Sequence, residues 1–190
     1  AYAQVGQENA FGWPAMKDGL TDQIALLDEL SKQGKVRVET LADSAKWYKQ
    51  QFETTPPTCV VAMDDWKGQG RRALWYDSKY YRTSIAWDGD ALRIRDIHLF
   101  DERYAERYLD SIVTTNWCVY DTLPILDGFS WSSETELAGI RPVSIDAEGN
   151  AAPLSGGVPR VSQENAKELQ IVWPLKQEGA LTVRCQDDAL

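Results

Sequence analysis

The sequence is poor in the residues that mark most metal and redox centres. Its 190 residues include one histidine, His98, and three cysteines, Cys59, Cys118 and Cys185, which are far apart along the chain. An odd number of scattered cysteines forms neither a disulfide framework nor a metal-binding cluster. We expect three buried thiols, with one disulfide as the alternative. No cofactor and no metal site are expected.

The chain has no apolar run long enough to cross a bilayer. It also has no cluster of basic residues. Its formal net charge is −9. Because the phosphates of nucleic acids and anionic membranes attract clustered Lys and Arg, this surplus of acid argues against nucleic-acid partners and against membrane insertion. The length suits one domain with a substantial core.

Specific catalytic motifs are missing as well. No G-x-S-x-G nucleophile elbow occurs, and residues 130–133 are expected to form a loop. Gly68-Gln69-Gly70 resembles a phosphate-binding loop only superficially, because no Lys-Ser/Thr pair and no helix follow it. We expect a turn between two strands there.

A hairpin is the clearest local structure that the sequence predicts. Asp88-Gly89 suits a two-residue type I′ turn, which would pair Ile85 with Leu92. One face of the hairpin is then apolar. The opposite face carries three arginines, Arg82, Arg93 and Arg95.

Two polar residues lie further along the second arm of the hairpin. Side-chain alternation puts Asp96 and His98 on the side of Leu92 and Ile94, toward the presumed core. An unpaired buried polar group costs roughly 1–3 kcal/mol, so we expect a satisfied pair at a strand end. The alternative is an acid/base or metal pair at the mouth of a cleft. A zinc site requires three protein ligands, and the sequence shows no third.

The first part of the chain predicts helices and strands in turn. Thr21 and Thr40 are expected N-caps of helices at residues 22–33 and 41–52, and Gly34 suits a helix end. Strands are expected at residues 36–39 and, buried, at 59–63.

Beyond Arg71 the pattern changes to strands. Asp101 is expected to cap one inserted helix at 101–111. Residues 147–150 are expected to form a turn. Further strands are predicted at 119–125, 138–145, 168–173 and 180–185. The fold class is therefore α+β, mainly an antiparallel β-sandwich with N-terminal helices. We expect residues 1–63 to form a helix-strand-helix-strand lead that packs on a sandwich domain of residues 64–190.

Aromatic residues are abundant, with eight Trp and eight Tyr. Trp and Tyr stack on the apolar faces of sugars, and arginines bind carboxylates through paired hydrogen bonds. The candidate ligand-binding residues are Trp66, Trp75, Tyr80, Arg82 and Arg95. In the alternative interpretation these side chains cover the sheet and the arginines pair with the surplus acids.

Pairs of carboxylates are candidates for glycoside hydrolysis, which uses two acids roughly 5–10 Å apart. The sequence offers Asp64-Asp65 beside Trp66, Asp96, and Asp101-Glu102. In an acidic protein, adjacent acids are more often solvent-exposed or capping residues.

Several segments resemble a known class of proteins. They are residues 34–41, Trp47-Tyr48, residues 55–58, Trp75-Tyr76, residues 80–82 and residues 94–102. Together they resemble the closing part of large bacterial carbohydrate-active proteins, in which a polysaccharide-deacetylase-like or glycosidase-like (β/α) barrel passes into a carboxy-terminal β-sandwich. The resemblance covers about residues 10–130 and implies an accessory domain in the periplasm or outside the cell. The paired histidines of the deacetylases are absent, since His98 is the only histidine.

These observations predict a carbohydrate-associated β-sandwich module of a polysaccharide-processing protein, which acts in substrate binding or domain support. Its expected partners are carbohydrate, acidic glycans included, and an adjacent domain or partner chain. One alternative is a small hydrolase or isomerase of the glycoside hydrolase type, with Asp96 and His98 as catalytic acid and base. The other is a purely structural interaction domain.

Overall fold

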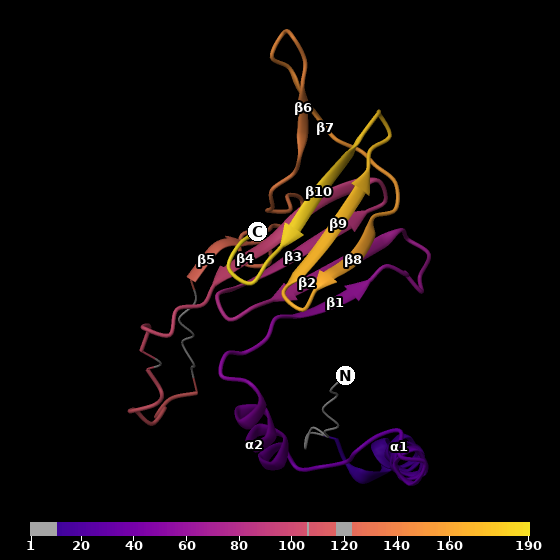
Figure 1. The fold of residues 1–190 in the computed structure, drawn as a ribbon, viewed down its shortest axis with the longest axis vertical. Coiled ribbons are helices and arrows are strands. Elements are labelled where there is room, and N and C mark those ends of the chain that lie inside the picture. The colour runs from indigo at the N-terminus through magenta and orange to yellow at the C-terminus, as the bar shows by residue number, and fades with distance from the viewer. Residues whose placement is uncertain (1–10, 106, 117–122) are drawn as a thin grey trace. The chain divides into compact units, whose positions relative to one another are not determined.

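The computed structural model describes residues 11–105, 107–116 and 123–190, which belong to two compact units, Ala1–Glu53 and Thr54–Leu190. The first unit contains the helices α1 (Trp13–Lys32) and α2 (Leu41–Gln51), shown in Figure 1. Neither helix has a buried residue. In the described parts of the chain, no helix combines the length and apolar character that a membrane span requires.

Helix α1 begins nine residues earlier than the sequence predicted. Pro14 lies in its first turn, where the missing N–H and the fixed φ of proline suit a helix start. Thr21, the predicted N-cap, is inside the helix, and its hydroxyl donates a hydrogen bond to the Lys17 carbonyl at 2.7 Å. Gly34 follows the helix end with φ 69°, as predicted.

Helix α2 begins where predicted. The Thr40 hydroxyl accepts a hydrogen bond from the Asp43 N–H at 3.1 Å, which satisfies one of the free donors of the first turn. The strand predicted at residues 36–39 is not formed. The first unit is therefore helical.

The second unit consists of antiparallel sheets, and the predicted fold class is confirmed. Five strands pair in chain order: β1 (Thr58–Ala62), β2 (Arg71–Asp77), β3 (Tyr81–Asp88), β4 (Ala91–Leu99) and β5 (Leu123–Asp127). A second sheet has the order β10 (Ala180–Cys185), β9 (Glu168–Pro174), β8 (Arg160–Asn165). A hairpin of β6 (Val143–Ile145) and β7 (Ala151–Pro153) completes the unit.

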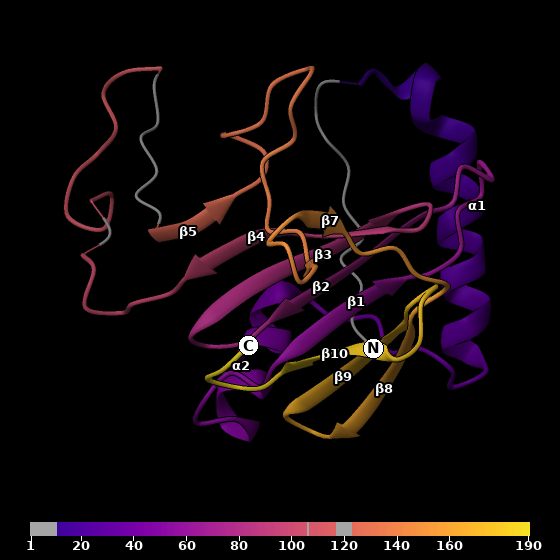
Figure 2. The same cartoon turned by 90° about the horizontal axis from the view of Figure 1, so that it is seen from above.

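The core lies between the two larger sheets. Figures 1 and 2 both show β8, β9 and β10 stacked on one face of the five-stranded sheet. The apolar side chains from both sheets that are at most 1% exposed are Leu74, Ile85, Trp87, Ile171, Trp173 and Cys185. The Tyr76 hydroxyl adds a hydrogen bond across the layers, to the Lys167 carbonyl at 2.9 Å.

The Asp-Gly turn between β3 and β4 is present, one residue further along than predicted. Its two central residues are Gly89, with φ 61°, and Asp90. Positive φ at the first central position alone is typical of a type II′ turn. Ile85 therefore faces Ile94 instead of Leu92, and this shift by two residues leaves the predicted faces unchanged near the turn.

An extra residue in β4 changes the faces further along the hairpin. Ile94 pairs with Ile85, but Asp96 pairs with Ser84, so Arg95 between them is a β-bulge residue without a partner. One inserted residue transfers all later side chains of the strand to the other face. The prediction that the Asp-His pair points into the core is therefore wrong. Asp96 lies with Ser84 on the outer face.

Two further predictions fail for local reasons. Residues 101–105 and 107–116 form turns and bends instead of the inserted helix. The Asp101 carboxylate accepts a hydrogen bond from the Arg103 N–H at 3.0 Å and pairs with the Arg103 guanidinium at 2.7 Å. Such local bonds offer the backbone an alternative to a helix. Strand β1, predicted to be buried, is exposed throughout because it is an edge strand that pairs only with β2.

The later strands agree in part with the sequence. Strands β9 and β10 and the turn at residues 147–150 are confirmed. Of the strand predicted at 138–145 only β6 forms, and residues 119–122 and Cys118 lie outside the described residues. Cys185 is a buried free thiol as predicted, whereas Cys59 is exposed because it lies on the β1 edge.

Candidate functional site

The outer face of the five-stranded sheet carries most of the predicted ligand-binding residues. Trp75 of β2 pairs with Ser84 of β3 on this face. The guanidinium carbon of Arg82 lies 5.8 Å from the centroid of the Trp75 ring, and that of Arg95 lies 5.0 Å from it. Both distances are in the range of cation–π contacts. Three of the five predicted residues are thus brought together around one ring.

The other two predicted residues lie elsewhere. Trp66 is in the β1–β2 loop, 90% exposed, with the Lys67 ammonium 5.1 Å from its ring. Tyr80 lies beyond the opposite end of β2, with the Lys79 ammonium 6.0 Å from its ring. They flank strand β2 and do not join Trp75.

The two arginines differ in their partners. The Arg95 Nε donates a hydrogen bond to Asp96 Oδ2 at 2.8 Å. Arg82 makes no ion pair with any described residue, and its buried Nε has no hydrogen-bond partner. Arg82 does have an acidic neighbour, its cross-strand partner Asp77, with which it interacts electrostatically without forming an ion pair. The alternative in which surplus acids neutralise the arginines therefore applies to Arg95 and only in part to Arg82.

Asp96 is 5% exposed and both of its oxygens are used. Besides the Arg95 bond at Oδ2, its Oδ1 accepts a hydrogen bond from the Gly128 N–H at 2.9 Å. A Cβ on Gly128 would lie 2.4 Å from the Arg95 carbonyl oxygen. The backbone at this position therefore approaches β4 more closely than any residue with a side chain could. Asp96 thus fixes the loop that follows β5 to the bulge.

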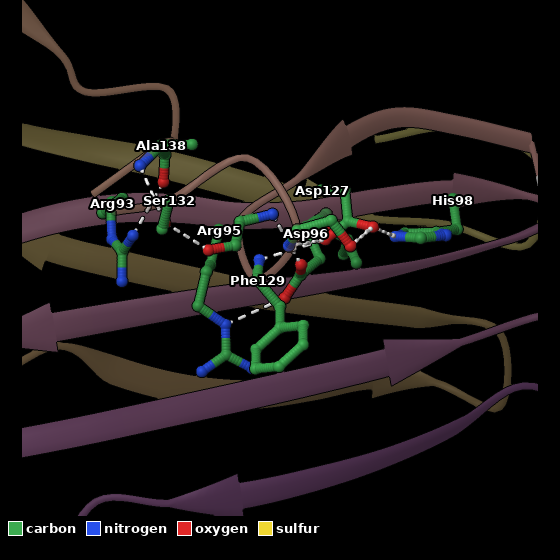
Figure 3. A network of polar contacts seen from close by, with 11 residues as sticks. Arg93, Arg95, Asp96, His98, Asp127, Phe129, Ser132 and Ala138 are labelled. Carbon is green, nitrogen blue, oxygen red and sulfur yellow. Dashed lines mark hydrogen bonds and ion pairs between the residues drawn. The ribbon is translucent and has the colours of Figure 1, made fainter. Parts of the chain in front are cut away.

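His98 is 6% exposed and lies beside Asp127 of β5. Its Nε2 is 4.0 Å from Asp127 Oδ2, and Figure 3 shows the ring directed at that carboxylate. Asp127 accepts hydrogen bonds from the N–H groups of Phe129 and Ser130 and from the Ser130 hydroxyl. The backbone bond from Ser130 is the main reason that the pKa of Asp127 lies below its ordinary value, and nearby His98 adds to the effect.

Asp96, His98 and Asp127 form one group. Each offers a ligand atom, and these atoms all lie within 4.8 Å of one another. The sequence predicted the first two as a pair and missed Asp127. An Asp at a strand end, three residues before a Ser, is typical of an Asx turn. That local signal does not reveal the neighbour across the sheet.

Two exposed aromatic side chains were also missed. Phe129, 90% exposed, and Trp131, 54% exposed, lie on the loop that Asp96 holds against β4. Their position beside the outer face follows from the β4–β5 pairing and not from their own sequence neighbourhood.

Two of the carboxylates proposed for glycoside hydrolysis, Asp65 and Asp101, have local structural roles. Asp65 accepts hydrogen bonds from three backbone N–H groups of its own loop. The Arg103 side chain holds the pKa of Asp101 at about 2. A general acid for glycoside hydrolysis needs a raised pKa, so neither carboxylate suits that role.

Comparison with known proteins gives no relative. No family model matches the chain, and no curated protein or solved structure is significantly similar to it.

Proposed function

We propose that residues 54–190 are a carbohydrate-associated module whose outer sheet face binds an acidic sugar. The observation that carries this proposal is the pair of guanidinium groups at the Trp75 ring, one of which, Arg82, has no ion-pair partner among the described residues. The cross-strand neighbour Asp77 interacts with Arg82 electrostatically but forms no ion pair with it, so the guanidinium keeps donors for an anionic ligand. Guanidinium groups bind carboxylates through two parallel hydrogen bonds.

The exposed aromatics of the neighbouring loop support the same function. Phe129 and Trp131 present apolar surface to solvent. Aromatic rings of this kind pack on the C–H faces of sugar rings. The Asp96–Gly128 hydrogen bond keeps their loop next to the bulge, so a saccharide on the outer face would meet guanidinium and aromatic groups together.

In this proposal the chain is part of a polysaccharide-processing protein of the bacterial periplasm or exterior, and the module supports substrate binding. An adjacent domain or a partner chain is the second class of partner. The exposed apolar residues of the helical unit, Trp13, Ile24, Leu26 and Leu41 among them, favour such an additional contact. They are also what a purely structural interaction domain would show.

A carbohydrate-active hydrolase or isomerase is the second candidate. His98 and Asp127 favour it, because an imidazole beside a carboxylate can act in proton transfer. Asp96, the partner that the sequence predicted, is less suited, since both of its oxygens already accept hydrogen bonds. If His98→Ala kept full activity on a panel of sugars, the hydrolase or isomerase function would be rejected.

Affinity electrophoresis tests the binding function. The chain is run through gels that contain an acidic polysaccharide, polygalacturonate or alginate, or a neutral one, dextran. We expect retardation by an acidic polysaccharide only. Arg82→Gln should weaken it about tenfold or more, since a hydrogen bond to a charged group contributes about 1.5–3 kcal/mol.

The matched control is Arg160→Gln, which removes the same charge from an exposed position on β8. It should leave the retardation unchanged. Equal weakening by both variants would show that net charge alone drives the interaction, and retardation by none of the gels would reject the proposal.

A further inference from the structure

The imidazole of His98 is buried beside two carboxylates. The ring is 6% exposed, and neither nitrogen forms a hydrogen bond to any described residue. Its nearest polar neighbour is Asp127 Oδ2 at 4.0 Å, which is too long for a hydrogen bond. Buried polar side chains are normally paired with protein, with an ordered water or with an ion.

The spacing of His98 and its neighbours suits ligands of one metal ion. Ligand atoms at about 2.0–2.2 Å from a tetrahedral ion lie about 3.4 Å from each other. The His98–Asp127 separation is 4.0 Å, and the ligand atoms of Asp96, His98 and Asp127 all lie within 4.8 Å of one another. A small rotation of these side chains would bring the three atoms around an ion.

The two carboxylates retain lone pairs for an ion. An ionised carboxylate has about four acceptor positions. Asp127 uses two at Oδ1, toward Phe129 and Ser130, and one at Oδ2, so a position remains on the oxygen that faces His98. Asp96 accepts one bond at each oxygen. Carboxylates that ligate metals are normally held in place by such additional hydrogen bonds.

The Ser84 hydroxyl is a second, independent sign of a missing ligand. Ser84 is completely buried, and its Oγ has no hydrogen-bond partner among the described residues. It pairs with Asp96, which pairs in turn with Asp127, so the three side chains form one cross-strand row on the outer face. A water or hydroxide bound to an ion there would be within the same row.

We propose that Asp96, His98 and Asp127 bind a divalent first-row transition metal ion, with Zn²⁺ the best match. One imidazole with two carboxylates suits Zn²⁺ better than Ca²⁺ or Mg²⁺, which prefer oxygen ligands alone. Three protein ligands leave a position for water or for an oxygen of a bound molecule. The site does not depend on the proposed binding of carbohydrate.

The test is a titration of the full chain, treated with chelator and kept reduced, with Zn²⁺. Binding is followed by calorimetry and by NMR of the imidazole C–H groups. Because His98 is the only histidine, one set of imidazole signals reports on the site. We expect one equivalent of Zn²⁺ to shift these signals, and His98→Gln and Asp127→Asn each to lower the affinity tenfold or more.

Asp127→Asn retains the Oδ1 acceptor that forms the turn with Phe129 and Ser130, so the loop should remain folded. Near-ultraviolet circular dichroism of the tryptophans checks this in each variant. Cys59→Ser is the matched control, because the exposed thiol of Cys59 is an alternative zinc ligand. It should leave both the affinity and the NMR shifts unchanged.

Two results would overturn the proposal. One is the absence of any change in the imidazole signals when Zn²⁺ is added in excess. The other is Zn²⁺ binding that Cys59→Ser abolishes and His98→Gln does not affect, which would identify adventitious binding to a thiol.

Discussion

The two faces of the five-stranded sheet are built from the same strands and differ in chemistry. The inner face contributes Leu74, Ile85 and Trp87 to a core that the three-stranded sheet covers. The outer face carries arginines around Trp75 and the group of Asp96, His98 and Asp127. Near the turn, simple alternation separates apolar from polar side chains. Beyond Arg95, the bulge does so, because it directs Asp96 and His98 outward.

The inner face contributes most to stability, and the outer face carries the groups proposed to bind ligands. Burial of apolar side chains on the inner face stabilises the fold, and the Tyr76 hydroxyl there donates a hydrogen bond to the Lys167 carbonyl. Buried polar atoms without hydrogen-bond partners among the described residues occur on both faces, at Arg82 and Ser84 on the outer face and at Trp87 on the inner face. Unpaired buried groups cost free energy, and in native structures a bound water or ion or a catalytic role can account for them.

Deletion of Arg95 should have the largest effect, since it removes the bulge and turns the later part of β4 over. Asp96 and His98 would then point into the core. We expect loss of the cooperative unfolding transition and of the near-ultraviolet circular dichroism. Arg95→Ala is the control, because it removes the guanidinium and keeps the residue count. A folded deletion variant would contradict the role of the bulge.

Ile171→Ala should destabilise the inner face strongly. Ile171 is completely buried in β9, and removal of a buried isoleucine side chain costs about 2–5 kcal/mol. The change in the free energy of unfolding is measured by urea denaturation. Arg82→Gln on the outer face should change it by less than about 0.5 kcal/mol.

Gly128→Ala should have an intermediate effect. The new Cβ would lie 2.4 Å from the Arg95 carbonyl oxygen and 2.5 Å from its Cγ, so the loop has to move away from β4. We expect a cost of about 1–3 kcal/mol and weaker binding of acidic glycan. Gly19→Ala in α1 meets no atom within 4 Å and should be neutral or slightly stabilising. Unchanged stability of Gly128→Ala would mean that the loop is not fixed to the bulge.

The inner face should make the protein sensitive to alkali. Burial raises the pKa of Tyr76 and of Cys185 each to about 12. The unfolded chain releases these protons at lower pH, so the stability they contribute is complete below the unfolded pKa values and is lost as pH rises through about 9 to 12. Cys185→Ala should reduce this loss in urea denaturation between about pH 8 and 11. Cys59→Ala, at an exposed thiol, should not.

The outer face should respond to acid, with the smallest effect. The folded structure lowers the pKa of Asp127, so its contribution to stability is present above the unfolded pKa and is lost as pH falls through the lower folded value. Asp127→Asn should therefore flatten the decline of stability below about pH 4. Asp64→Asn, at an exposed position, should leave the curve unchanged. A steeper decline in Asp127→Asn would contradict the sign.

Local patterns in the sequence predicted much of the fold. Thr40 caps α2, Gly34 follows α1, and the Asp-Gly turn joins two paired strands, because each of these features depends on a few neighbouring residues. The register was wrong by two residues, since Gly89 takes the first central position of the turn instead of the second. The start of α1 was missed because Pro14 was interpreted as part of a turn and not as a first-turn helix residue.

The candidate site was less predictable, because it depends on partners across the sheet. Trp75, Arg82 and Arg95 were identified from their chemistry, and both guanidinium groups lie near the Trp75 ring in the structure. The bulge has no signal in the sequence, since neither Gly nor Pro marks it. Asp127 reaches His98 only through the pairing of β5 with β4, which no local pattern encodes.

The strand order of the larger sheet has a consequence for folding kinetics. Each of its strands pairs with its neighbour in the sequence, whereas the hydrogen bond from Tyr76 to Lys167 closes a long loop. Short loops close faster and at a lower entropic cost than long ones. We expect the meander to gain protection from hydrogen exchange before β8, β9 and β10 dock on it. The outer face would then form while the inner face of the five-stranded sheet is still exposed to water.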